Sequence, residues 1–188
     1  KSKGNTVPAD DLIEKYGADT VRGFILFAAP PEKDYEWNNH GVEGVSRFIN
    51  RVIRVVEKFA DCKTKIVDIN CIPSDEVSKT VVKMLHKTIQ RVTDDIEKGF
   101  HFNTAISSLM EFINHLYSIE NLLDKNLWSG GRIQTINRKL DEELNSYIKE
   151  SLATFILLLA PFCPHISEEL WQKLGKTNSV FVQNWPKY

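Results

Sequence analysis

The chain has 188 residues, of which 42% are hydrophobic and 26% are charged, and its 24 Lys and Arg nearly balance its 25 Asp and Glu. This balance excludes a basic histone-like protein and an acidic disordered tail, so nucleic-acid binding would require charge gathered on one face. A chain of this length buries roughly 70% of its unfolded surface and needs no disulfide to hold a core.

Two further features bear on the compartment of the protein. The three cysteines, Cys62, Cys71 and Cys163, form no close pair in sequence, which favours buried thiols in a reducing environment. The longest apolar run, residues 155–160, is far shorter than the roughly 20 residues that span a bilayer. We therefore expect a soluble, cytoplasmic protein with no membrane partner. Because the chain opens on Lys1 rather than Met, we also expect a segment of a longer protein.

The first 40 residues predict a small helical connector. A short helix over 8–16 ends at Gly17, where a left-handed residue is needed, and a second short helix follows over about 19–27. Pro30 and Pro31 then end the helical pattern, and 32–40 form a polar loop.

From Gly41 onward, apolar residues recur at helical spacing. This pattern predicts four long helices, over about 42–60, 74–99, 103–123 and 136–159, the second with Ser74 as its N-cap and Val77 in its buried stripe. A shorter helix over 166–174 and a weakly alternating, extended tail over 179–185 complete the chain.

The predicted fold is therefore all-α. Four long antiparallel helices with short connections are typical of an up-down helix bundle. We assign this bundle to residues 41–188 and the small helical connector that precedes it to residues 1–40.

One helix carries the segregated charge in this sequence. Four basic residues in 42–60 recur at steps of four, three and four and fall within an arc of roughly 60°, opposite the apolar side. We call them the basic ridge: Arg47, Arg51, Arg54 and Lys58. Arginine can engage a phosphate with two parallel hydrogen bonds, so the ridge predicts binding to a nucleic-acid backbone without sequence reading. The alternative is an ordinary solvated helix face.

Other candidate sites are weak. Lys79, Lys83, Lys87 and Arg91 drift around their helix beside acidic residues, which favours a solvated face. The closest approach to metal-ligand spacing is Cys163-Pro164-His165, and packing at a helix start explains it better than a metal. We predict no metal site and no complete catalytic site. Lys1 and Ser2 open a loop, rich in Lys and Gly, of the kind that can fold over a polyphosphate.

Several segments together resemble one family, the class I aminoacyl-tRNA synthetases, and within it most closely the bacterial-type leucyl enzymes. Lys1-Ser2 followed by Lys3-Gly4-Asn5 is similar to the end of the Lys-Met-Ser-Lys-Ser signature, and 8–22 match the segment after that loop across the subgroup. The leucyl assignment depends on 26–32, Glu36-Trp37 and 41–48. The bundle helices of the leucyl family are matched by Phe102-Asn103-Thr104-Ala105-Ile106 and by residues 159–171.

The resemblance implies the C-terminal part of a leucine–tRNA ligase, with an anticodon-binding-type helical domain. Such an enzyme activates leucine with ATP and Mg²⁺ and transfers it to tRNA-Leu. Lys1 and Ser2 would contact the ATP phosphates, and Arg47, Arg51 and Arg54, with Lys58 weaker, would contact the tRNA. No cofactor is expected on this stretch alone, and no obligate protein partner is evident.

Two alternatives remain open at this point. The bundle could be a helical interaction module whose ridge binds an acidic protein, or it could be the same region of a valyl or isoleucyl enzyme. The signature residues of the nucleotide-binding fold are not in this sequence, so we expect this stretch by itself to have no aminoacylation activity.

Overall fold

The computed structural model describes the backbone of residues 7–33, 39–62, 64–128 and 138–188, and side chains over the same ranges except 120–128 and 138–141. Within these residues the secondary structure is entirely helical. The elements are α1 (Ala9–Tyr16), α2 (Ala18–Ala28), α3 (Asn39–Ala60), α4 (Glu76–Glu97), α5 (Phe102–Trp128), α6 (Arg138–Leu159), α7 (Pro164–Lys173) and a 3₁₀ turn, η1 (Val180–Val182). This confirms the all-α prediction. No helix in the described part of the chain is both long enough and apolar enough to cross a membrane.

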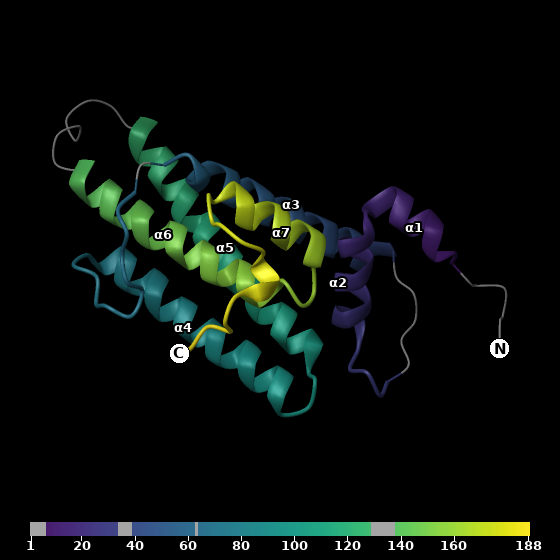
Figure 1. Ribbon diagram of the computed structural model, residues 1–188. Helices are drawn as coiled ribbons and strands as arrows, with labels where there is room; N and C mark the ends of the chain where they lie inside the picture. Colours follow the sequence, from purple (N-terminus) through teal and green to yellow (C-terminus); the bar gives the residue numbers. More distant parts are fainter. Residues whose placement is uncertain (1–6, 34–38, 63, 129–137) are drawn as a thin grey trace.

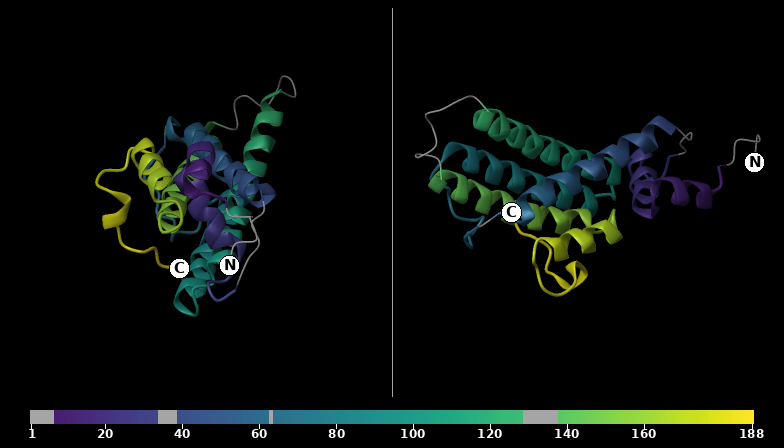
Figure 2. Two further views of the ribbon diagram at one scale, coloured as in Figure 1. Left: turned by 90° about the vertical axis from the view of Figure 1, so that its right-hand side faces the viewer. Right: turned by 90° about the horizontal axis from the view of Figure 1, so that it is seen from above.

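The four long helices alternate in direction, as expected of an up-down bundle (Figure 1). α3 and α5 run one way, and α4 and α6 run the other. α4 packs against α5 and α6, while α3 packs against α5, α6 and α7. The right-hand view of Figure 2 shows α1 and α2 together at one end of the bundle, where α2 contacts α3, α5 and α7.

The core lies where helical spacing placed it. The seven apolar residues that helical spacing predicts to face inward on α3 are all buried, namely Val45, Phe48, Ile49, Val52, Val55, Val56 and Phe59. α5 likewise buries an apolar stripe. The second half of α6 is enclosed on all sides, because the six consecutive residues 151–156 are all buried and together point in every direction around the helix. Phe112 of α5 stacks on Phe155 with ring centres 5.7 Å apart, which ties these two helices together.

Several details differ from the sequence-based predictions around α4. Its N-cap is Asp75 rather than Ser74, because the Asp75 side chain accepts a hydrogen bond from the Ser78 nitrogen. The hydroxyl of Ser74 instead donates to the carboxylate of Glu143 on α6. Val77 is 44% exposed, so it does not belong to the buried stripe predicted for α4. The connection from α3 to α4 spans residues 61–75, so it is longer than predicted.

The C-terminal tail also differs from its prediction. Residues 180–182 form a 3₁₀ turn rather than an extended segment. The turn begins at Ser179, whose hydroxyl accepts from the Phe181 nitrogen, and Glu168 of α7 accepts from the Val180 nitrogen at 2.9 Å. Local side-chain hydrogen bonds therefore override the weak alternation of the sequence.

Candidate nucleic-acid interface

The basic ridge lies along the outer side of α3. The apolar residues of α3 face the bundle, and the four ridge residues lie on the opposite side of the same helix. Arg47 and Arg54 are exposed, whereas Arg51 and Lys58 are partly buried. The ridge therefore presents cations at the protein surface, although its members differ in how much of each side chain the neighbouring elements cover.

Two ridge arginines contact α5. The Arg51 guanidinium donates a hydrogen bond from Nη1 to Oδ1 of Asn114. Its central carbon lies 5.2 Å from the centre of the Tyr117 ring, and that of Arg54 lies 5.3 Å from the same ring centre. Both distances are within the range of cation–π attraction. The outer face of α3 and the adjoining edge of α5 thus form one polar surface.

Carboxylates lie beside this surface rather than within it. Glu57 of α3 is paired with Lys173 of α7, so its charge is offset by a neighbouring helix. Glu111 of α5 pairs with Arg91 of α4 at 2.9 Å. Glu111 precedes Asn114 by one helical turn and so shares its face of α5. Glu57 and Glu111 therefore each have a basic partner.

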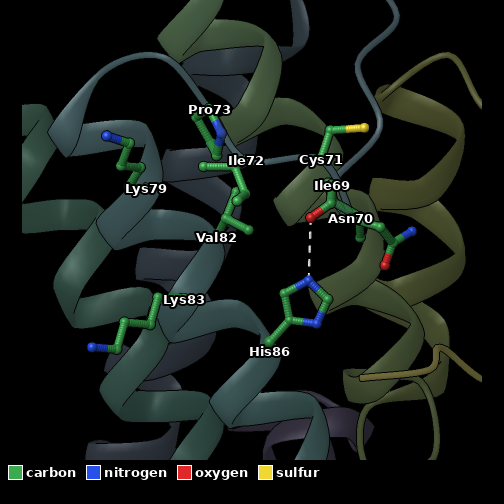
Figure 3. Close-up of a pocket in the computed structure, with 9 residues that line it drawn as sticks. All are labelled: Ile69, Asn70, Cys71, Ile72, Pro73, Lys79, Val82, Lys83 and His86. Atoms are coloured by element: carbon green, nitrogen blue, oxygen red, sulfur yellow. Dashed lines mark hydrogen bonds between the residues drawn. The ribbon is translucent and has the colours of Figure 1, made fainter.

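The basic residues of α4 do not continue the ridge. Lys79 pairs with Glu76 of its own helix at 2.7 Å, and Arg91 pairs with Glu111. Together with residues 69–73 of the α3–α4 connection, Lys79 and Lys83 line a cavity of about 290 Å³ between the connection and α4. Figure 3 shows both lysine side chains pointing away from residues 69–71. These lysines line that cavity instead of joining the surface formed by α3 and α5.

A histidine and a cysteine, His86 and Cys71, also line this cavity but do not form a common site. His86 is hydrogen-bonded through Nε2 to the carbonyl oxygen of Ile69, at 3.2 Å, which anchors the connection on α4. Figure 3 shows the Cys71 sulfur pointing away from His86. Among the residues that the structure describes, no group of three His, Cys, Asp or Glu side chains could hold a metal ion.

Cys163 is buried at the start of α7, as predicted, whereas the neighbouring His165 side chain is exposed. Burial raises the pKa of the Cys163 thiol to about 12, with the negative charge of Asp19 adding to the effect. The His165 ring nitrogen Nδ1 lies 2.9 Å from Oδ1 of Asp19, and Cys163 directs its thiol to the Asp19 carbonyl at 3.7 Å. A thiol with so high a pKa is not a nucleophile near neutral pH, so this cluster is structural.

Lys1 and Ser2, the predicted ATP-phosphate contacts, lie outside the described residues, as does Glu36-Trp37. The four ridge residues are all within them. The structure places these four on one helix and brings two of them together over Tyr117.

Comparison with known proteins gives the family. The protein-family model for the anticodon-binding domain of tRNA ligase matches residues 78–188, more than half of the chain. The chain belongs to the family of anticodon-binding domains of tRNA ligases. Leucine–tRNA ligases of Petrotoga mobilis and Thermotoga maritima are each 43% identical to this chain, and each match covers all of it. The chain spans 21% of the length of each of these relatives.

A solved structure agrees with the family assignment. A chain from the crystal structure of the ternary complex of Agrobacterium radiobacter K84 agnB2 LeuRS-tRNA-LeuAMS superimposes with a TM-score of 0.78 at 28% identity. The superposition covers 100% of this chain and 22% of that chain. The relatives match the leucyl branch of the resemblance, and the family match favours a tRNA-binding domain over a protein-interaction module.

The sequence did not point to Asn114 and Tyr117 as part of the surface of this anticodon-binding domain. Each follows a buried apolar residue, Ile113 or Leu116, so the helical pattern of α5 places both at the edge of its buried stripe. That position was visible in the sequence. Which helix lies across the edge was not, because it depends on how α3 and α5 pack.

Proposed function

We propose that this chain is the tRNA-binding part of a leucine–tRNA ligase and that the basic ridge on α3 contacts the tRNA backbone. The parent enzyme activates leucine with ATP and Mg²⁺ and transfers it to tRNA-Leu in the cytoplasm. The observation that carries the proposal is the ridge itself, because Arg47, Arg51 and Arg54 share the outer side of α3, a helix whose opposite side is buried in the bundle. Its test is the binding of tRNA by variants of this face.

The proposed division of labour follows the connector and the bundle. Residues 1–40 join the bundle to the part of the enzyme that holds ATP, and Lys1 and Ser2 contact the ATP phosphates. Residues 41–188 bind tRNA. Support for this division comes from α2, which packs against α3, α5 and α7 and so fixes the connector on the end of the bundle. A tRNA docked on the bundle is thereby held in a set orientation to the connector.

Phosphate binding explains why the ridge contains arginine. A guanidinium forms charge-assisted hydrogen bonds with phosphate oxygens, and each neutralised phosphate releases counterions. Such contacts orient a nucleic acid but do not distinguish its sequence. We therefore assign the ridge to positioning the tRNA, while specificity for tRNA-Leu comes from elsewhere in the parent enzyme.

Charge reversal in this 188-residue chain tests the proposal. We expect Arg51→Glu to weaken the binding of a labelled tRNA-Leu transcript by about tenfold and to reduce the salt dependence of that binding. The matched control is Lys83→Glu, which reverses one exposed charge beside the α4 cavity and should change affinity by less than about twofold. Equal losses in both variants, or no binding of tRNA at low salt, would contradict the proposal.

A second comparison separates positioning from sequence reading. The chain should bind tRNA-Leu and another tRNA of equal length with similar affinity, because backbone contacts carry no sequence information. Strong preference for tRNA-Leu by the isolated chain would assign base contacts to it.

A further inference from the structure

Tyr117 stands out on the surface formed by α3 and α5 because two cations share its ring. Arg51 and Arg54 lie three residues apart on α3, and their guanidinium carbons are 5.2 and 5.3 Å from the centre of this one aromatic ring. Tyr117 is partly buried and comes from a different helix. The ring therefore lies where it can restrain both side chains at once.

The register of the helices produces this arrangement. α3 and α5 run in the same direction, so positions three residues apart on one helix face positions three residues apart on the other (Figures 1 and 2). Arg51 reaches Asn114 and Tyr117, which are themselves three residues apart, and Arg54 reaches Tyr117. Two long side chains from α3 are thus held against two adjacent side chains of α5.

Restraint of this kind matters for phosphate binding. A free arginine side chain has many rotamers, and fixing them on binding costs free energy. A guanidinium that already lies over a ring loses less freedom when a phosphate arrives. The hydrogen bond to Asn114 uses one of the five N–H groups of Arg51, so four take no part in this bond.

We propose that Tyr117 is a positioning residue that holds Arg51 and Arg54 as one paired phosphate-binding unit for the RNA backbone. Asn114, by accepting a hydrogen bond from Arg51, sets the orientation of the Arg51 guanidinium within that unit. The inference rests on the proposed tRNA-binding function. In it, Tyr117 acts by holding the two arginines and does not itself contact a base.

The test uses the 188-residue chain and a labelled tRNA-Leu transcript. Tyr117→Leu removes the ring and should weaken binding by about five- to tenfold, the effect of losing two exposed cation–π contacts. The slope of affinity against salt should stay unchanged, because both charges remain. Tyr117→Phe keeps the ring and should bind within about twofold of the original chain.

A double-mutant cycle distinguishes positioning from direct contact. In a chain that already carries Arg51→Ala and Arg54→Ala, Tyr117→Leu should have no further effect on affinity, since nothing is left for the ring to restrain. An equal loss in both backgrounds would show that Tyr117 contacts the RNA itself, for example by stacking on a base, and would overturn the proposal. An unchanged affinity for Tyr117→Leu alone would overturn it too.

A measurement on the unsubstituted chain makes the proposal independent of whether Tyr117→Leu folds. Side-chain NMR relaxation should show Arg51 and Arg54 to be more restricted than Arg47, which lies over no aromatic ring among the described residues. Equal mobility of all three would contradict positioning. If Arg51→Glu weakens tRNA binding while Tyr117→Leu does not, the proposed function stands and this inference alone fails. If neither variant changes binding, both fail.

Discussion

The carboxylate of Asp19, in the first turn of α2, accepts a hydrogen bond from the backbone nitrogen of Ile166, in the first turn of α7, at 2.7 Å. The N-cap residue of α7, Cys163, provides no side-chain cap. Asp19 therefore replaces it, and one buried carboxylate lies at the positive ends of two helices. Arg22 of α2 adds a hydrogen bond to the Pro161 carbonyl at 3.3 Å, so the connector is attached to the bundle at this point.

Removing this shared cap should destabilise the whole chain. We expect Asp19→Ala to lower the free energy of unfolding by about 1–2 kcal/mol, because the first turn of α7 loses its acceptor. Urea denaturation followed by circular dichroism measures the change. Asp61→Ala, at an exposed position just after α3, is the control and should shift stability by less than about 0.5 kcal/mol. A similar loss in both variants would show that Asp19 has no special capping role.

Gly41 should tolerate no side chain. A Cβ atom at this position would lie 2.6 Å from Cε2 of Phe24, which is buried between α2 and α3 and cannot move aside. We therefore expect Gly41→Ala to destabilise the chain by about 1–2 kcal/mol in thermal or urea unfolding, despite the better helix propensity of alanine.

Gly44 of the same helix is the matched control for Gly41. Its nearest neighbour would be Arg47 Nη2 at 3.9 Å from the added Cβ, an ordinary contact. Gly44→Ala should stabilise the chain by up to about 1 kcal/mol. A stabilising Gly41→Ala would mean that α2 and α3 are not packed as closely as described.

Glu111 should limit the affinity of the surface for RNA. Its carboxylate pairs with Arg91 and lies one turn from Asn114, so Glu111→Gln frees one cation and removes a negative charge near the bound phosphates. We expect tRNA affinity to rise by about two- to fivefold at low salt, the range of exposed charge interactions. Glu76→Gln also frees a cation, Lys79, but does so at the start of α4. The same gain from Glu76→Gln would assign the effect to net charge rather than to position.

The contact between α7 and η1 should depend on pH. Hydrogen bonds from the Ser179 hydroxyl, and then from the Val180 nitrogen, hold the pKa of the Glu168 carboxyl below its usual value, against a smaller opposing effect of burial. A carboxyl whose pKa is lowered by folding stabilises the folded state above its unfolded pKa. That stabilisation is lost as the pH falls through the lowered folded pKa.

NMR of the Val180 amide can follow this transition. We expect its chemical shift to move as the pH is lowered below the usual carboxyl range of about 4.3. Glu168→Gln, which cannot ionise, should abolish the movement. A transition that persists in Glu168→Gln would assign it to another carboxyl group.

The amino-acid sequence by itself determined the helices, their buried faces and the ridge. The seven inward residues of α3 and the enclosed second half of α6 follow from apolar spacing alone, because burial in a helix repeats with the helical period. The same arithmetic places Arg47, Arg51, Arg54 and Lys58 on the opposite side of α3. These features are local, and a single segment contains all the information they need.

Only the tertiary structure decided which residues meet across helices. Asp19 and Ile166 are far apart in the sequence, as are Arg51 and Asn114, and no periodicity within one helix predicts such pairs. Ser74 illustrates the limit, since a plausible local cap instead bonds to Glu143 of α6 and leaves Asp75 to begin α4. The capping of α7 and the ordering of two arginines by Tyr117 depend on packing distances of a few ångströms. Those distances are set by how whole helices fit together.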